Sequence, residues 1–192
     1  MPEAGSTALL ALWNDVDPAL DAAYNDWHAR EHVPERLTVP GIVWALRYAC
    51  DGGAPMPRYL TLYGLRDPQV LDSPAYRRLL EHPTPASRAM RPALRNLSRW
   101  VCTLDVQEGI ERCRHLAVRT VEHAAPVPAL TEGCARLVAT RIPEAAALPW
   151  LAGGQSRPIE GDRLEGLAHD GRQAAWPTAT VYTLRDGFNT KS

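Results

Sequence analysis

Two histidines in the segment HAREH, His28 and His32, are the residues of this sequence best suited to proton transfer. The ordinary pKa of an imidazole lies near neutrality, so its surroundings decide whether it acts as an acid or as a base. We predict that His32 is the catalytic residue and expect the end of a helix to favour its protonated form. The alternative is that the His32 ring bonds a backbone carbonyl and fixes the chain before Pro34.

The spacing of these histidines also suggests a metal site. HAREH matches the H-x-x-E-H pattern of inverted zinc peptidases, in which two imidazoles on one helix face share a metal. Zinc requires a third protein ligand, however, and Pro34 interrupts the helix that should carry it. We therefore predict that no metal binds at His28 and His32.

A second group of candidate residues is aromatic or polar and lies on segments typical of strands. Adjacent strands can bring such residues together into a pocket for an aromatic ligand, although the same residues also suit a core. The predicted substrate-binding residues are His28, Trp13, Asn14, Trp44, Tyr63 and Trp100.

The histidines are expected on a helix that follows the first strand, which is predicted over residues 8–16. Leu20, Tyr24 and Trp27 recur at helical spacing and are predicted to face a sheet. Pro34 limits the regular helix to about residue 32, with at most a kinked turn to residue 37. In an ideal α-helix His32 lies about 140° around the helix axis from Trp27. We therefore expect His32 to lie beside the buried helix face formed by Leu20, Tyr24 and Trp27.

The remaining patterns indicate an α+β fold. Strands are predicted over 42–50, 58–66 and 97–106, with helix over 68–81 that resumes to about residue 94. This βαββαβ order is typical of a ferredoxin-like unit. Further strands are predicted over 114–122, 135–142 and 179–185, while 143–178 is expected to be a Gly/Pro-rich loop with one short helix near 145–151. We predict tandem ferredoxin-like (βαββαβ) units that form a dimeric-type α+β barrel: a complete unit over 1–106 and a degenerate one over 107–192, packed on the first.

The first half of the chain resembles the EthD-like branch of the dimeric α+β-barrel superfamily. The most specific part of the resemblance is W-x-x-x-E-H-x-P-E-R followed by V-P-G, which runs from Trp27 to Gly41. The resemblance singles out His32 and implies a structural role for Glu31, Pro34, Glu35, Arg36 and Gly41. We expect Glu35 and Arg36 to form an ion pair or hydrogen bonds that hold the loop to Gly41.

The resemblance also implies a function class. Proteins of this superfamily bind small, often aromatic or oxygenated molecules between helix and sheet, and many act without a cofactor, although some are haem enzymes. A homodimer is expected on the same ground. No cofactor is predicted here, with haem left open because His115, His123 and His169 are scattered through the second half.

Composition excludes some other classes of protein. Lys and Arg number 21 against 22 Asp and Glu, so the net charge is -1 and no basic run favours nucleic acid. The apolar run near the start is too short to cross a bilayer, and no signal sequence precedes it. We therefore expect a cytoplasmic protein that binds neither nucleic acid nor membrane.

Two functions remain. The first is a cofactor-free acid/base enzyme that catalyses cyclisation, dehydration, isomerisation or oxygenation of a hydrophobic or aromatic oxygenated substrate. The second is a ligand-binding or accessory protein of a catabolic or biosynthetic pathway, which holds the same molecule without turnover. A structure distinguishes a His32 that borders a cavity from one tied into the backbone.

Overall fold

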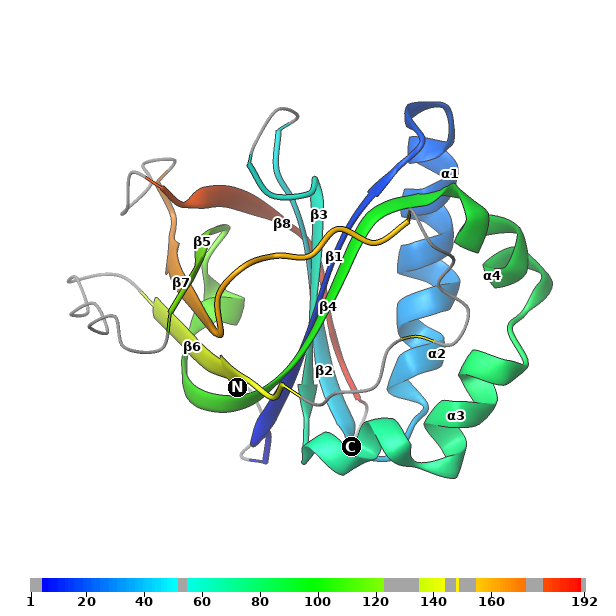
Figure 1. Ribbon diagram of the computed structural model, residues 1–192, viewed down its shortest axis with the longest axis horizontal. Coiled ribbons are helices and arrows are strands. Elements are labelled where there is room, and N and C mark those ends of the chain that lie inside the picture. The colour runs from blue at the N-terminus through cyan, green and yellow to red at the C-terminus, as the bar shows by residue number, and fades with distance from the viewer. Residues whose placement is uncertain are drawn as a thin grey trace.

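The computed structural model of the protein describes residues 5–51, 55–122, 135–143, 148, 155–171 and 178–190. Eight strands in this part of the chain form one closed barrel in the order β1-β3-β2-β8-β5-β7-β6-β4, and every neighbouring pair is antiparallel (Figure 1). The strands are β1 (Ala8–Val16), β2 (Ile42–Ala49), β3 (Tyr59–Leu65), β4 (Leu94–Glu108), β5 (His115–Val121), β6 (Ala135–Arg141), β7 (Arg163–His169) and β8 (Thr180–Asn189).

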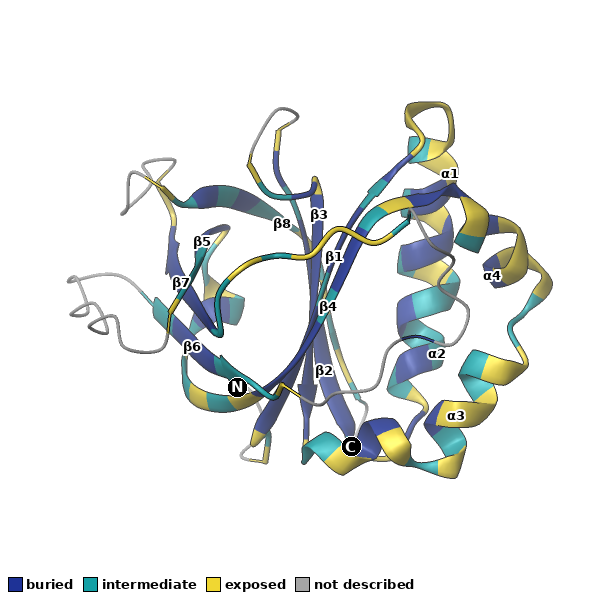
Figure 2. Cartoon of the chain, in the orientation of Figure 1, coloured by how far each residue is buried: buried dark blue, intermediate teal, exposed yellow. Residues whose placement is uncertain are grey.

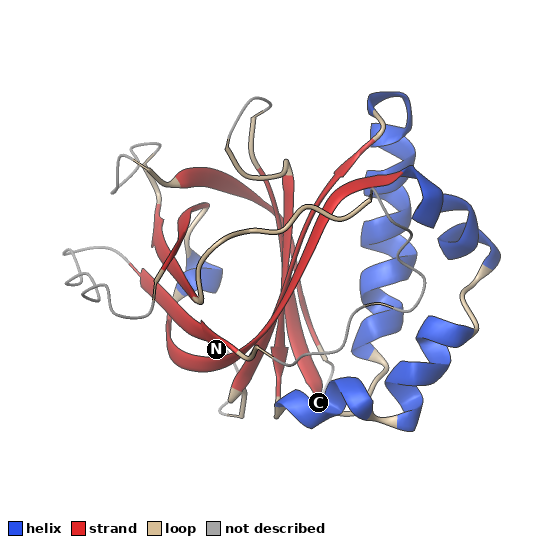
Figure 3. Ribbon diagram, in the orientation of Figure 1, coloured by secondary structure: helices blue, strands red, loops and turns tan. Residues whose placement is uncertain are grey.

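The helices gather on one side of this barrel, against the strands of the first half (Figure 3). The first connection holds η1 (Pro18–Leu20), α1 (Asp21–Trp27), η2 (His28–His32) and α2 (Val33–Leu37), and the second holds η3 (Pro68–Asp72), α3 (Pro74–Glu81), α4 (Pro85–Met90) and η4 (Arg91–Ala93). In the described part of the second half, only the short turn η5 (Ile110–Arg112) is helical. No described helix is both long and apolar enough to cross a membrane.

Sequence signals set the start of several of these helical segments. Asp17, Ser73 and Thr84 each accept a hydrogen bond from a backbone N–H of the turn that follows. A proline comes directly after each of the three, where its fixed φ suits the first helical turn and its missing N–H costs nothing.

The prediction of tandem ferredoxin-like units in an α+β barrel is wrong. The two halves do not form two separate sheets, because β8 pairs with β2 and β6 pairs with β4, which closes a single antiparallel β-barrel within one chain. Each half thereby covers the exposed strand edges of the other, and closure removes edges altogether. The helices needed for a second α+β unit are not found among the described residues.

One strand was missed by the sequence analysis. Residues 163–169 form β7, which pairs with both β5 and β6, although 143–178 was expected to be a loop. Its sequence RLEGLAH contains glycine, glutamate and alanine, which are depleted in strands, and the pairing with β5 and β6 makes it a strand. The short helix expected near 145–151, apart from Leu148, lies outside the described residues, as does His123.

Alternation along the strands divides the core between two faces. On β1, Leu9, Ala11 and Trp13 point into the barrel, where they join one apolar cluster with residues of the second half. Ala8 and Leu10 point outward, into a separate cluster with Val33 and other residues of the helical layer. Strands β1, β2 and β3 are therefore buried on both faces over most of their length, as the dark colouring of Figure 2 shows.

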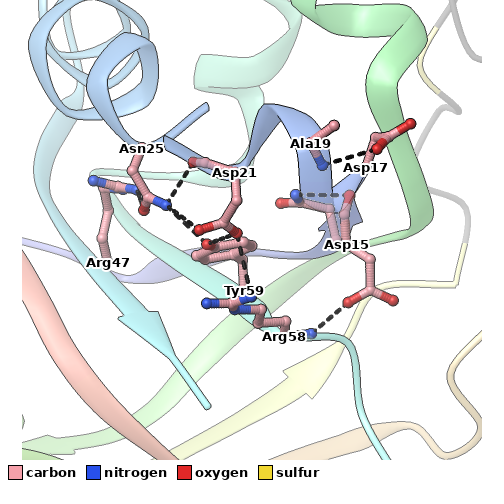
Figure 4. Close-up of polar contacts among 9 residues, drawn as sticks. Asp15, Asp17, Ala19, Asp21, Asn25, Arg47, Arg58 and Tyr59 are labelled. Carbon is pink, nitrogen blue, oxygen red and sulfur yellow. Dashed lines mark hydrogen bonds and ion pairs between the residues drawn. The ribbon is translucent and has the colours of Figure 1, made fainter. Parts of the chain in front are cut away.

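A polar network fixes how α1 sits on these strands (Figure 4). Tyr59 of β3 donates a 2.5 Å hydrogen bond to Asp21 and accepts one of 2.8 Å from Asn25. Arg47 of β2 donates to Asn25 and also pairs with Asp186 of β8 at 2.5 Å. Because Asp21 and Asn25 lie on one face of the helix, these bonds set its rotation.

The tightest contact in the barrel interior joins Gly64 to Trp44. These residues are partners across β3 and β2, and a Cβ built on Gly64 would lie 2.1 Å from the Trp44 indole. The indole is itself held by a 2.9 Å bond from Nε1 to Ser6. Only glycine therefore leaves the space that the buried indole occupies.

We expect Gly64→Ala to lower the free energy of unfolding by about 1–3 kcal/mol, because the buried indole must move. Gly187→Ala is the matched control, since its Cβ meets only the flexible tip of Leu46 at 3.3 Å and should change stability by less than about 1 kcal/mol. Urea unfolding of both variants measures the difference. Equal losses in the two would show that the indole does not restrict position 64.

Candidate active site

A pocket lies between the helical layer and the outer face of β1 and β4. The volume open to the centre of a water-sized sphere is about 60 Å³. One water needs roughly 10–15 Å³ on this measure, so the pocket has room for a small organic ring. A smaller cavity of about 10 Å³ shares Leu12, His32, Arg36 and Tyr76 with it. The walls of the main pocket are Leu12, Tyr24, Trp27, Tyr76, Leu80, Leu94, Leu97 and Leu148, and its polar residues are Asn14, His28, His32, Arg36 and Arg91.

A π-helical turn brings the two histidines into this pocket. Helix α1 does not end at His32 but continues through η2 into α2, and the Val33 N–H bonds the His28 carbonyl five residues back. Pro34 follows directly, within the first turn of α2. Such single π-turns inside helices are frequent at functional sites.

The π-turn corrects the expected direction of His32. In a regular α-helix this residue would lie well away from Trp27, but the wider turn aligns residues five apart, and the two ring centroids are 4.5 Å apart. The His28 ring lies 5.0 Å from His32 and 5.2 Å from Tyr24. Both histidines and two aromatic side chains thus form one continuous cluster.

Neither histidine ring is tied down by hydrogen bonds in the described part of the chain. The Nδ1 atoms of both rings are buried without a partner. The expected alternative, in which His32 bonds a backbone carbonyl, is therefore not observed. By contrast, the neighbouring Tyr24 donates a 3.0 Å hydrogen bond to Asn14.

The site keeps both imidazoles uncharged. Burial lowers the pKa of His28 and of His32 well below the ordinary value, and the positive charge of Arg36 lowers both further. The expectation that a helix end favours the protonated form of His32 is wrong, because the helix continues past it. A neutral imidazole can accept a proton, so His32 is suited to act as a base rather than as an acid.

Arg36 is the most buried cation of the pocket, with only 6% of its surface exposed. Its contacts are a 3.4 Å bond to Glu35 and the ring of Tyr76, whose centroid lies 5.8 Å from the guanidinium carbon. Arg91, in contrast, donates to the carbonyls of Leu80 and Leu79. Burial lowers the pKa of Arg91.

The other residues of the motif connect the helix to its surroundings. Glu31 accepts a hydrogen bond from Thr84, the residue that caps α4. Gly41 has φ of 97°, which favours glycine, and a Cβ there would lie 2.4 Å from Val70. Glu35 and Arg36 contact each other, and their backbone carbonyls accept the N–H groups of Thr38 and Val39 on the way to Gly41.

The structure separates the predicted substrate-binding residues into two groups. Asn14 and His28 line the main pocket together with His32, and Tyr63 lines the smaller cavity, where its buried hydroxyl has no described partner. Trp13, Trp44 and Trp100 lie inside the barrel instead. Trp13 and Trp100 contact each other there edge to face at 5.6 Å.

Sequence analysis missed the contribution of the second helical connection to this pocket. Tyr76, Leu80 and Arg91 come from α3 and η4 and complete the lining of the pocket. The sequence did predict helix over 68–81, which contains Tyr76 and Leu80. Nothing in the sequence indicated that Arg91 faces the same space.

A second histidine pair lies in the other half of the barrel. His115 and His169 are partners across β5 and β7, with ring centroids 5.8 Å apart, and His115 bonds Thr183. Within the described residues, no group of three or more His, Cys, Asp or Glu side chains is placed to hold a metal ion.

Comparison with known proteins gives a fold but no family. No protein-family model matches the chain, and no curated protein matches its sequence. The crystal structure of an anthrone oxidase-like protein is similar, with a TM-score of 0.61 and 12% identity over 100% of this chain and 96% of that one. At this identity the likeness shows the fold alone, and the EthD-like resemblance stays a prediction.

The buried neutral histidines predict a specific loss of stability in acid. Because their folded pKa values lie below the unfolded value near 6.5, the unfolded chain takes up protons first as the pH falls. The contribution of the two neutral histidines to stability is complete above about pH 6.5 and decreases below it. When the pH falls from 7.5 to 5.5, each histidine should lower the free energy of unfolding by about 1.4 kcal/mol.

Urea unfolding at the two pH values checks this in the wild type and in the double variant His28→Gln with His32→Gln. The wild type should lose more stability from pH 7.5 to pH 5.5 than the double variant does. An equal loss in both proteins would mean that the two imidazoles titrate normally.

Proposed function

We propose that the protein binds a small aromatic or hydrophobic oxygenated molecule in this pocket and that His32 removes a proton from it. The observation that supports this most directly is a pair of neutral imidazoles with buried, unpartnered nitrogens in an aromatic pocket. A base in such surroundings has no competing protein hydrogen bond and little water to compete for its lone pair. His28, 5.0 Å away, supports the orientation of His32.

The proposal places the protein among EthD-like, cofactor-free enzymes, on the basis of the motif from Trp27 to Gly41. The fold shared with an anthrone oxidase-like protein adds a class of reaction to test. In this reaction His32 takes a proton from the substrate, and the electron pair spreads onto the ring and its oxygen. The carbanion then reacts with dioxygen, so the substrate itself supplies the electrons.

The overall reaction balances without another reductant. Anthrone and dioxygen give anthraquinone and water, with one oxygen atom entering the new carbonyl and the other leaving as water. 1-Naphthol and dioxygen give 1,4-naphthoquinone and water in the same way. 1-Naphthol has two fused rings where anthrone has three, so it is the closer match to a cavity of about 60 Å³.

We expect His32→Gln to lower the rate of quinone formation by about 10²–10⁴-fold, the usual contribution of a general base. The free energy of unfolding at neutral pH should change by less than about 1 kcal/mol, because no described hydrogen bond is lost and the volume is nearly kept. Dioxygen uptake with anthrone and with 1-naphthol measures the first effect, and urea unfolding the second.

His169→Gln is the matched control. This residue is also buried, with a lowered pKa and an unpartnered ring nitrogen, but it lies outside the pocket. Its replacement should leave the rate unchanged. Saturable binding of 1-naphthol by the wild type without any dioxygen uptake would instead identify a ligand-binding protein that performs no turnover.

A further inference from the structure

Arg36 has more hydrogen-bonding capacity than its protein contacts use. A guanidinium carries five N–H donors in a fixed fork. In the described structure its polar contact is one long bond to Glu35, its sequence neighbour, and the Tyr76 ring lies under its charge. A cation that is only 6% exposed is costly unless an anion compensates it.

The other arginines near the pocket, Arg91 and Arg47, donate hydrogen bonds to acceptors within the protein. Arg91 donates to two backbone carbonyls of α3. Arg47 pairs with Asp186 and also donates to Asn25. Arg36, by contrast, lines both cavities together with His32, so its side chain borders the space that a ligand would occupy.

We propose that Arg36 is the oxyanion-binding residue of this pocket and that the ligands are aromatic molecules whose ring oxygen carries a negative charge, a phenolate or an enolate. The inference rests on the proposed function and specifies its substrate class. When the O–H or C–H proton passes to His32, the charge left on the ligand oxygen is held by the Arg36 guanidinium. Charge and proton then remain within one pocket, and neither is released to water.

The division of roles suits the two side chains. Arg36 stays charged throughout, so it stabilises an anion without exchanging a proton. His32 is neutral before the reaction and so does not compete with Arg36 for the anion. Preorganised donors aimed at a developing oxyanion are among the strongest contributions to catalysis.

Two ligands of nearly the same shape test the proposal. 4-Nitrophenol ionises at mildly alkaline pH, and its phenolate absorbs in the visible range, whereas 4-nitroanisole carries a methyl ether and stays neutral. At that pH we expect the wild type to bind the phenolate about tenfold or more tighter than the ether, the usual effect of a charged hydrogen bond. At neutral pH the bound phenol should show more phenolate absorbance than the free one.

Arg36→Met should abolish this preference and the extra phenolate absorbance, while binding of 4-nitroanisole changes by less than about twofold. Arg30→Met is the matched control, because Arg30 lies on the same helical segment but is exposed and paired with Asp26 outside the pocket. It should keep the wild-type preference.

Each remaining outcome is decisive. If the wild type binds both ligands equally, or Arg36→Met keeps the preference, the oxyanion role is wrong and the proposed base function of His32 still stands. If neither ligand binds the wild type, both proposals fail. Should Arg36→Met not fold, Glu35→Gln replaces it: removing the carboxylate beside Arg36 should strengthen the preference for phenolate, and an unchanged ratio would overturn the inference.

Discussion

The hydrogen bond from the Val33 N–H to the His28 carbonyl determines the geometry of the site. This i→i+5 bond widens one turn of the helix and aligns Trp27 with His32, whose ring centroids are then 4.5 Å apart. In an ordinary α-helix the same residues would point in different directions, and His32 would not complete the cluster with His28. The π-turn keeps its place because α1 is anchored to β2 and β3 through Asn25 and its partners, and because Val33 is fully buried against the outer face of the barrel.

Barrel closure supplies the rigid support that this local irregularity requires. The sheet of the first half has two long edges, and both are paired with strands of the second half, so its curvature is fixed from both sides. Its inner face packs on a core shared by both halves, which leaves the outer face to hold the helices and the pocket. A second half without described helices thus still serves the site, since it fixes the position of β1 and β4 on which the ligand would lie.

The sequence predicted the parts of this arrangement that depend on local pattern. Strand-like segments located β1, β2 and β3, and the helical spacing of residues such as Tyr24 and Trp27 located the helix after β1. Sequence also singled out His28, His32 and Asn14, which the structure brings to one pocket. It could not predict the closure of the barrel, because the pairing of β2 with β8 joins segments about 140 residues apart and leaves no local signal. The predicted direction of the His32 side chain was wrong for a related reason. The prediction assumed the residue spacing of an α-helix, which a π-turn does not follow.

The pocket and the smaller cavity beside it contain several groups that a protein selected for stability alone would avoid. His28 Nδ1, His32 Nδ1 and the Tyr63 hydroxyl are buried without described partners, and each such atom costs about 1–3 kcal/mol. Arg36 adds a buried cation with one long ion pair. Unpartnered polar atoms also occur elsewhere among the described residues, on the uncharged indoles of Trp13 and Trp100 inside the barrel and on ionisable side chains such as His169. On the helical side, by contrast, the neutral base His32 and the fixed cation Arg36 border the same cavity. A molecule that offers both a proton and an oxyanion would satisfy them together, and this combination accounts for their burial better than structural need does.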